Sequence, residues 1–393
     1  MLSAHQRHLV QSTVPLLEAG GEQLITHFYG LLLAEHPEVR VLFNQTHQVS
    51  GDQPRALANG VLMYARHIDR LDALGPLVGQ IVAKHVSLQI LPEHYPLVGG
   101  CLLRAIREVL GETVADAAML EAWAAAYQQL ADLLIGAEEQ QYAANAAVPG
   151  GWRGARWFKV ARKVRESEEI CSFYLQPEDG QAVPGYLPGQ YIGLKLNLDG
   201  EEVRRNYSLS TAPNGREYRI SVKREPSGRA SAHLHDRVRE GDRLELFPAA
   251  GAFVLRDSGK PLVLISAGVG ITPTLSMLEA ALPSGRPIHF IHCARHGGVH
   301  AFGPTVQALA DQHPQLRQYV CYSEPRTGDA PDASGFLSRA LLADWLPEDP
   351  DLEAYFLGPK AFMVQVKQHL AALSVPQQQS HYEFFGPASA LEG

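Results

Sequence analysis

Residues 261–273 read Pro-Leu-Val-Leu-Ile-Ser-Ala-Gly-Val-Gly-Ile-Thr-Pro, from Pro261 to Pro273, and carry the clearest fold signal in the chain. It predicts an apolar strand, a glycine turn and the start of a helix. At such a junction the backbone N–H groups and the positive end of the helix dipole face an anion, here expected to be a pyrophosphate. A Rossmann fingerprint would have a third glycine where this chain has Pro273, so the motif is a variant of that pattern.

The residues that follow repeat the alternation of strand and helix. From Lys260 onward, strands are expected at 262–266, 288–293, 318–322 and 354–357, with helical stretches between them. This βαβ pattern predicts a parallel sheet.

Upstream, from Trp152, the sequence changes to short β-rich runs. They are expected at 155–164, 170–175, 191–196, 218–222 and 243–247. Turn signals such as Asp199-Gly200 and Asn214-Gly215 separate them, which predicts a small antiparallel β-barrel.

The first 143 residues are rich in Ala, Leu, Glu and Gln, with apolar residues at helical spacing, such as Leu120, Trp123 and Tyr127. The small residues from Ala143 onward end in Pro-Gly-Gly and predict a linker. We therefore expect an all-α domain at 1–147, a barrel at 152–257 and an α/β domain at 258–393. A chain of 393 residues is long enough for each to have its own core.

Composition excludes several classes of protein. The net charge is −8, from 34 Lys and Arg against 42 Asp and Glu, and the dispersed basic residues argue against a nucleic-acid surface. The four cysteines show neither metal-ligand nor disulfide spacing, so a reduced, cytoplasmic setting is expected. No run reaches the roughly 18 apolar residues of a membrane helix, and the N-terminus lacks a signal peptide's features, so no integral membrane segment is expected.

A second motif, Arg205-Asn206-Tyr207-Ser208, resembles the Arg-x-Tyr-Ser strand of the ferredoxin-reductase family. In that family the aromatic ring covers a flavin, the hydroxyl faces its reactive nitrogen and the arginine holds phosphate. The resemblance extends to Gln190-Tyr191 before the motif and Ser231 after it, and together these pieces imply a binding site for FAD.

The glycine motif resembles the nicotinamide domain of the same family, with Gly268, Gly270, Thr272 and Pro273 at the dinucleotide. Near the C-terminus, the run from Tyr382 to Pro387 implies that Phe385 stacks on the flavin face that nicotinamide must reach. Many relatives have a cysteine where this chain has Leu357, which puts in doubt a thiol near the hydride path.

A histidine in the helical zone is a candidate metal ligand. The window from residue 77 to 88 places Val78, Val82 and His85 on one apolar face. Taken alone, such a histidine is usually an ordinary core residue. The segment resembles the proximal helix of the globin domain of flavohaemoglobins, and the resemblance makes His85 the iron ligand. It also implies that Tyr95 and Glu138 hydrogen-bond His85 and make its imidazole more electron-donating.

Four further residues match the distal side of the same globin domain. Tyr29 matches the distal tyrosine, Phe43 the phenylalanine that wedges the haem, Gln53 the distal glutamine, and Leu57 the leucine one turn later. The phenol and the amide would donate hydrogen bonds to bound oxygen. The alternative is that Tyr29 and Phe43 are core aromatics and Gln53 a solvated helix start.

The chain is thus identified as a member of the flavohaemoglobin (flavohemoprotein) family over essentially its whole length. The resemblance implies an all-α globin, an antiparallel β-barrel for FAD and a parallel α/β domain for NAD(P)H, with haem b, FAD and NAD(P)H as cofactors. The implied activity is that of a nitric oxide dioxygenase: NAD(P)H reduces FAD, FAD reduces haem iron, and the oxygen complex of the ferrous haem converts NO to nitrate. O₂ and NO are then the partners.

Alternatives stay open on the sequence. The protein could be an O₂ or NO sensor, or a reductase of diffusible acceptors with haem incidental to it. Arg295, after the second α/β strand, gives a slight preference for the 2′-phosphate of NADPH. A monomer is expected, and a lipid is considered as an occupant of the distal haem pocket.

Overall fold

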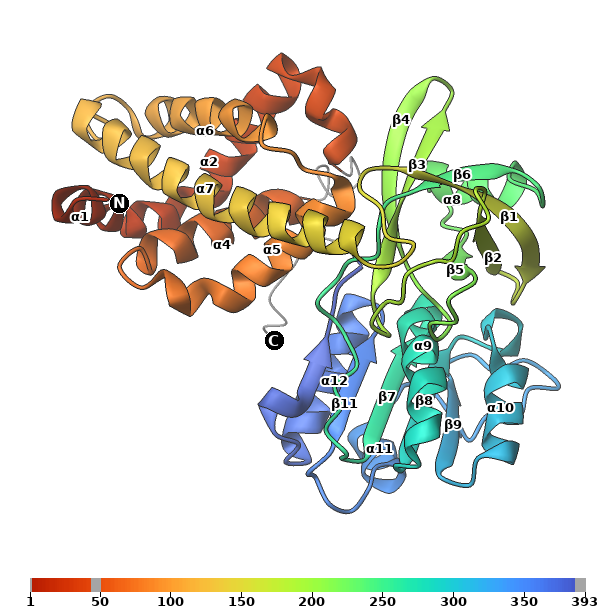
Figure 1. Ribbon diagram of the computed structural model, residues 1–393. Coiled ribbons are helices and arrows are strands. Elements are labelled where there is room, and N and C mark those ends of the chain that lie inside the picture. Colours follow the sequence, from red (N-terminus) through yellow and green to blue (C-terminus); the bar gives the residue numbers. More distant parts are fainter. Residues whose placement is uncertain (1, 44–50, 386–393) are drawn as a thin grey trace. The chain divides into compact units, whose positions relative to one another are not determined.

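The computed structural model describes residues 2–43 and 51–385. The chain divides into two compact units, one running to Ala147 and including Phe385, the other running from Val148 to Phe384 (Figure 1).

The first unit is helical, as the apolar spacing predicts. Its helices in the described residues are α1 Ala4–Ser12, α2 Val14–Glu35, η1 Pro37–Leu42, α4 Asp52–Arg66, η2 Leu71–Leu74, α5 Gly75–Leu88, α6 His94–Leu110 and α7 Ala117–Ala147. Helix α2 packs against α4 and α6, and α7 packs against α1, α5 and α6. Phe28, Leu32 and Trp123 are among the buried residues of the shared core.

The predicted linker is wrong over its first five residues. Helix α7 continues through Ala143 to Ala147 before it ends. Small residues alone do not end a helix, because alanine has the highest helix propensity of all residues. The chain leaves the helix only at Val148-Pro149-Gly150, where Gly150 has a φ of 75°.

The end of α5 brings the candidate haem ligand His85 toward Tyr95, its predicted hydrogen-bond partner. Gln89 follows the helix in the left-handed region at φ 59°, and the N–H of Ile90 donates to the carbonyl of His85. This cap stops the helix within a turn of His85 and returns the chain toward α6, which carries Tyr95.

The second unit contains an antiparallel six-stranded sheet. Its elements are β1 Arg156–Arg165, β2 Ile170–Pro177, β3 Tyr191–Leu198, β4 Glu201–Ser208, β5 Tyr218–Lys223, helix α8 Arg229–Asp236 and β6 Arg243–Leu246. The strand order is β4-β3-β6-β1-β2-β5. A bridge between Leu209 and Ile220 joins the two outer strands, so the sheet curls into the predicted barrel.

The same unit contains a six-stranded sheet whose pairings are all parallel, in the order β10-β9-β8-β7-β11-β12. Its strands are β7 Leu262–Ala267, β8 Ile288–Ala294, β9 Leu316–Tyr322, β10 Ala333–Ser334, β11 Glu353–Leu357 and β12 Ser380–Tyr382. The helical elements between them are η3 Gly268–Gly270, α9 Ile271–Ala281, η4 Leu282–Ser284, η5 Gly297–Val299, α10 Gly303–Gln312, α11 Arg339–Trp345, α12 Lys360–Ala372 and η6 Gln377–Gln379. The short strands β10 and β12 were not predicted, because two or three residues carry no detectable periodicity.

Alternate side chains of the parallel sheet enter two different cores. Leu262 and Leu264 belong to the core on the side of α9, whereas Val263 and Ile265 belong to the core with α12. This two-sided burial explains the uninterrupted apolar run of β7. The strand order reverses between β7 and β11, and ligands bind at such a switch point in open α/β sheets.

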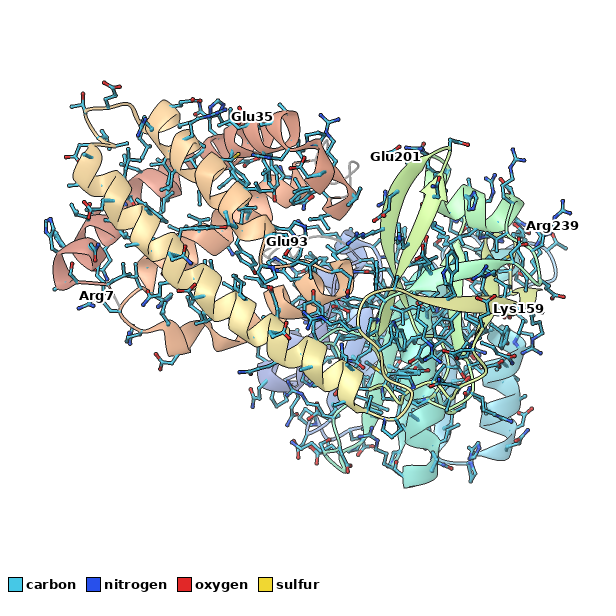
Figure 2. The ribbon with its side chains drawn as sticks, turned by 45° about the horizontal axis from the view of Figure 1, so that its top comes forward. Arg7, Glu35, Glu93, Lys159, Glu201 and Arg239 are labelled. Atoms are coloured by element: carbon cyan, nitrogen blue, oxygen red, sulfur yellow. The ribbon has the colours of Figure 1, made fainter. Side chains whose placement is uncertain are left out.

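Charged side chains are distributed over both units, with the labelled Arg7 and Glu35 at the surface of the helical unit and Lys159, Glu201 and Arg239 at the surface of the other (Figure 2). None of the helices that the structure describes is long and apolar enough to span a bilayer.

Candidate functional site

Three of the predicted residues meet in the helical unit, each from a different helix. His85 of α5, Tyr95 of α6 and Glu138 of α7 form a closed hydrogen-bonded triangle. His85 Nδ1 lies 2.6 Å from Glu138 Oε1 and 3.2 Å from the Tyr95 hydroxyl, which donates to the same carboxylate oxygen at 2.6 Å. Because Nδ1 is engaged, Nε2 is the ring nitrogen that can bind a metal.

The triangle is most deeply buried at the carboxylate of Glu138. Glu138 is only 2% exposed, and burial together with the hydrogen bond to Glu138 raises the pKa of the Tyr95 phenol. Two tyrosines that sequence reasoning did not single out support the group. Tyr127 donates to the carbonyl of Tyr95 at 2.6 Å, and Tyr142 donates to the carbonyl of Ile90 at 2.7 Å.

The predicted distal residues lie on α2 and α4 and beside η1. The buried ring of Tyr29 meets that of Phe43 edge-on, with centroids 5.5 Å apart. Gln53 and Leu57 are one turn apart on α4 and therefore on one face of it, and α4 packs against α2. Phe43 and Leu57 both pack against the core that contains Tyr29.

The predicted flavin motif forms the end of β4, paired with β3. Tyr191 is the partner of Ser208, and both are buried. Gln190 accepts from the N–H of Leu187 at 2.9 Å and donates to the carbonyl of Gly251, so its side chain shapes the loop before β3. Ser231 has a similar role on α8, where its hydroxyl donates to the carbonyl of Gly228.

Alternation along β4 places Arg205 and Tyr207 on one face and Asn206 and Ser208 on the other. Burial lowers the pKa of Arg205 and raises that of Tyr207. Among the described residues no carboxylate forms an ion pair with Arg205, whose guanidinium donates to the carbonyl of Arg204 at 2.7 Å. A largely buried cation without a carboxylate partner suits an anionic ligand such as phosphate.

The glycine motif lies at the switch point of the parallel sheet. Gly268 has a φ of 55°, and a Cβ on Gly270 would lie 2.2 Å from the carbonyl oxygen of Leu357 at the end of β11. Only glycine allows this approach of α9 to β11. Pro273 stands in the first turn of α9, where its missing N–H costs nothing, so the departure from the three-glycine pattern is tolerated.

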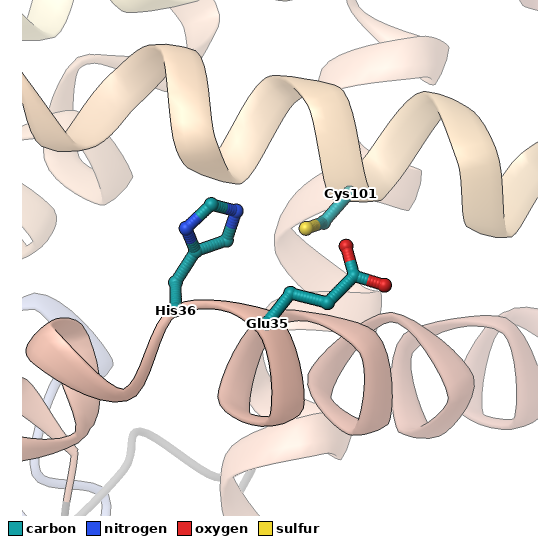
Figure 3. Close-up of side chains that lie close together, drawn as sticks. All are labelled: Glu35, His36 and Cys101. Atoms are coloured by element: carbon teal, nitrogen blue, oxygen red, sulfur yellow. The ribbon is translucent and has the colours of Figure 1, made fainter.

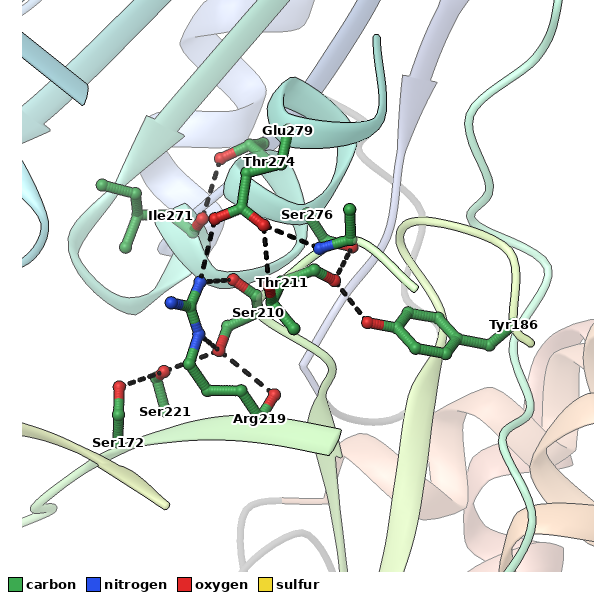
Figure 4. Close-up of polar contacts among 11 residues, drawn as sticks. Ser172, Tyr186, Ser210, Thr211, Arg219, Ser221, Ile271, Thr274, Ser276 and Glu279 are labelled. Atoms are coloured by element: carbon green, nitrogen blue, oxygen red, sulfur yellow. Dashed lines mark hydrogen bonds and ion pairs between the residues drawn. The ribbon is translucent and has the colours of Figure 1, made fainter. Parts of the chain in front are cut away.

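A buried polar network joins the flavin motif to the helix that follows the glycine motif (Figure 4). The carboxylate of Glu279 on α9 accepts from the hydroxyl of Thr211 and the N–H of Ala212, both at 2.7 Å. Ser276 donates to the carbonyl of Thr211 at 2.7 Å. Arg219 of β5, which is 7% exposed, pairs with Glu279 at 3.3 Å.

Comparison with known proteins matches each of these parts to a family model. Residues 26–134 match the globin model, residues 157–254 the oxidoreductase FAD-binding domain, and residues 264–368 the oxidoreductase NAD-binding domain. Over 392 residues, covering the whole of both chains, the protein is 71% identical to a flavohemoprotein of Pseudomonas aeruginosa. The chain belongs to the flavohemoprotein family. A flavohemoprotein of Pseudomonas putida is 64% identical over the same span.

Solved structures agree with this assignment. A flavohemoglobin from Malassezia yamatoensis, determined with bound FAD and heme, superposes with a TM-score of 0.86 at 24% identity, covering 98% of this chain and all of that one. The FAD/NAD-binding domain of a nitric oxide dioxygenase from Vibrio cholerae is 39% identical, with a TM-score of 0.56, covering 60% of this chain and all of that one. The predicted family and fold class are thus confirmed.

The structure shows the surroundings of three further residues that were named from the sequence of this flavohemoprotein, Arg295, Leu357 and Phe385. Arg295 forms an ion pair with Glu169, next to β2, so a 2′-phosphate would have to compete with that carboxylate. Leu357 is fully buried in β11, opposite Ser266. Phe385 is 49% exposed, and its place against the flavin stays a prediction. The Gly386-Pro387 that follows it lies outside the described residues.

Sequence reasoning missed Arg219, Glu279 and Thr211 in this flavohemoprotein. The only available signal was that Ser210-Thr211 follows the flavin motif after one residue, Leu209. An arginine in one strand and a glutamate in a helix some 60 residues later have no spacing that would pair them.

Proposed function

We propose that the protein is a nitric oxide dioxygenase that takes electrons from NAD(P)H and converts NO and O₂ to nitrate. The observation that carries this proposal is the buried Glu138, which holds both His85 Nδ1 and the Tyr95 hydroxyl in the same chain as an FAD- and NAD-binding reductase. A simple oxygen carrier needs neither an electron-rich proximal histidine nor a reductase.

As a flavohemoprotein, the chain has haem b, FAD and NAD(P)H as its cofactors. His85 would bind the iron through Nε2, and Phe43 and Leu57 would border the haem. The FAD site would comprise seven residues around the end of β4, namely Gln190, Tyr191, Arg205, Asn206, Tyr207, Ser208 and Ser231. The nicotinamide nucleotide would be held by Gly268, Gly270, Thr272 and Pro273. When bound, these groups supply hydride acceptance, single-electron transfer and oxygen activation.

The proximal residues act through the imidazole. The Glu138 carboxylate accepts the Nδ1 proton of His85 in a hydrogen bond, which makes Nε2 a stronger donor to iron. Tyr95 holds the carboxylate in place through the same oxygen. With haem bound, a strongly donating imidazole would favour O–O chemistry over reversible carriage of oxygen.

The distal residues act on the diatomic ligand. The Tyr29 phenol and the Gln53 amide are donors that would stabilise negative charge on a bound diatomic ligand, and the ring of Phe43, nearly perpendicular to that of Tyr29, places apolar surface beside the phenol.

The proposal includes the organisation and setting of the chain. It divides into a globin domain at 1–147, an FAD domain at 152–257 and an NAD(P)H domain at 258–393. It acts as a monomer on O₂ and NO in the cytoplasm, where its four free cysteines stay reduced.

The test is NO consumption by the purified protein, with nitrate measured as product. Turnover should require O₂ and NAD(P)H together. His85→Ala should lose the haem spectrum and NO turnover but keep reduction of a soluble dye by NAD(P)H. Wild-type NO removal that is no faster with both substrates than with either one would contradict the proposal and favour a sensor. Undiminished oxygen-dependent NAD(P)H oxidation in His85→Ala would favour a reductase of diffusible acceptors.

A further inference from the structure

We propose that Glu35, His36 and Cys101 form a Zn²⁺ site in the helical unit, separate from the haem ligands. One donor atom from each side chain lies within 4.8 Å of the other two. Figure 3 shows the three side chains converging, with the Cys101 sulfur directed between the carboxylate of Glu35 and the imidazole of His36.

The local sequence explains why two consecutive residues reach the same point. Glu35 is the last residue of α2, and His36 precedes Pro37, which opens η1. A residue before proline avoids the helical region, and His36 has a φ of −123° and a ψ of 71°. The chain therefore turns at His36, and the side chains of His36 and Glu35 both face α6. Cys101 comes from α6, which packs against α2.

The donor set selects the metal. A thiolate, an imidazole and a carboxylate are the three ligand types of zinc sites, and three protein ligands leave a fourth position for water. The sulfur excludes Mg²⁺ and Ca²⁺, which take oxygen ligands.

One ring nitrogen of His36 already has the carboxylate partner that metal-binding histidines commonly have. Its Nδ1 lies 3.2 Å from the carboxylate of Glu38, which leaves Nε2 for the ion. A histidine that binds metal through one ring nitrogen commonly donates the other N–H to a carboxylate, and this contact fixes both the tautomer and the orientation of the ring.

Arg104 is the competitor for the site. Its guanidinium forms a fork with Glu35, with Nη1 3.0 Å from Oε2, and its Nε lies 3.4 Å from Glu108. When zinc binds, the Glu35 carboxylate would leave Arg104 and bind the metal. The guanidinium of Arg104 would stay paired with Glu108. The protein without zinc therefore has a stable alternative arrangement, and the proposal predicts that removal of Arg104 strengthens zinc binding.

The consequence of occupancy is a cross-link between α6 and the junction of α2 with η1. Helix α2 carries Tyr29, and Phe43 follows η1, so the cross-link would hold the two elements that carry the distal residues. Saturating zinc should raise the thermal midpoint of haem release by roughly 5 °C, because it binds the folded state.

The experiment is equilibrium dialysis of the full-length holoprotein against ZnCl₂ after chelator treatment, with zinc and iron both counted by elemental analysis. Wild type should bind one zinc per chain at micromolar free zinc. Cys101→Ser and His36→Gln should each weaken binding at least 10-fold, and Glu38→Gln about 10-fold. Arg104→Gln should tighten zinc binding.

Two variants are matched controls and should bind zinc as wild type does. Cys171→Ser changes a free cysteine on β2, and His8→Gln changes an exposed histidine.

Two further measurements keep the outcome clear. Intact haem and flavin spectra show that a variant is folded, and His36→Gln, at the surface, serves if Cys101→Ser is unstable. Cd²⁺ binding should give a thiolate charge-transfer absorption in wild type that Cys101→Ser abolishes and Cys171→Ser retains. Absence of stoichiometric zinc in wild type, or equal binding by Cys101→Ser and wild type, would overturn the proposal.

Discussion

Tyr29 is the residue whose single hydroxyl should have the largest effect on oxygen. It is buried on α2, and its ring lies nearly perpendicular to that of Phe43. Loss of a buried donor to a charged ligand costs about 1–3 kcal/mol, or one to two powers of ten in rate. Tyr29→Phe should therefore release O₂ about 10 to 100 times faster in flash photolysis and lose NO turnover at limiting oxygen. Flavin reduction by NAD(P)H is the internal control and should hardly change.

The effect should grow when the second donor is also removed, because Gln53 lies on the helix that packs against α2. If the double variant with Gln53→Leu releases O₂ no faster than wild type, neither side chain is a distal donor.

His300 makes the second unit sensitive to acid. It is buried with Nδ1 2.8 Å from the Tyr322 hydroxyl, its ring lies 4.5 Å from that of His292, and burial lowers its pKa to about 4. Below an unfolded-state pKa of about 6.5 the unfolded chain takes up the proton and the folded chain does not, so stability is complete above pH 6.5 and falls toward pH 4. At pH 5 this residue alone should cost about 2 kcal/mol.

Urea unfolding of the second unit, followed by flavin fluorescence at pH 7 and pH 5, measures this dependence. Between the two pH values, the free energy of unfolding of His300→Gln should fall by about 2 kcal/mol less than that of wild type. His8→Gln, an exposed histidine in α1, is the control, and the same pH slope in His300→Gln and wild type would argue against the assignment.

At the scale of elements, the contact between the start of α9 and the end of β11 sets the nucleotide crevice. A Cβ at Gly270 would lie 2.2 Å from the Leu357 carbonyl oxygen, whereas one at Gly268 would meet open space within the described structure. Gly270→Ala should force the helix from the sheet at a cost of about 3 kcal/mol and raise the KM for NAD(P)H. Gly268→Ala, with only its positive φ to strain it, should cost about 1 kcal/mol. Equal losses in the two variants would refute the packing argument.

The buried pair of Arg219 and Glu279 joins two further elements, β5 of the barrel and α9. Glu279→Gln leaves the guanidinium buried without its counter-charge and should cost about 3 kcal/mol. Stopped-flow reduction of FAD by NADH should slow, because Thr211 and Ala212, just after the flavin motif, lose their carboxylate acceptor. Adding Arg219→Met should recover part of the stability, and a strictly additive double variant would show that the two groups do not interact.

For the whole molecule, the division after Ala147 predicts that the reductase works alone. A chain beginning at Val148 should fold, bind FAD and reduce a soluble dye with NAD(P)H at a rate within a few-fold of the full protein. Val148 is a better start than Trp152, because Arg156 donates to the carbonyl of Gly150 at 2.8 Å. An insoluble or flavin-free product from this start, but not from the full chain, would place the boundary elsewhere.

The family, the order of the three folds and the type of nearly every long element could be predicted from the amino-acid sequence. Those signals are local: helical spacing over the first 143 residues, alternating runs in the barrel, and the strand, glycine turn and helix around Gly268 and Gly270. A local pattern can be recognised without knowing what it packs against. The same property misled the linker prediction, since Ala143 to Ala147 look like a linker by size but are helical by propensity.

Contacts between side chains far apart in the chain could not be predicted from local patterns. Glu279 is 60 residues from Arg219, and this separation has no period that predicts contact. The 53 residues between His85 and Glu138 have none either, and it was the family resemblance that implied their hydrogen bond. Which carboxylates Arg295 and His36 contact likewise depends on how the chain folds back or turns. Contacts of this kind are fixed by the packing of whole helices and strands, because burial of their apolar faces sets the distances at which the polar groups then pair.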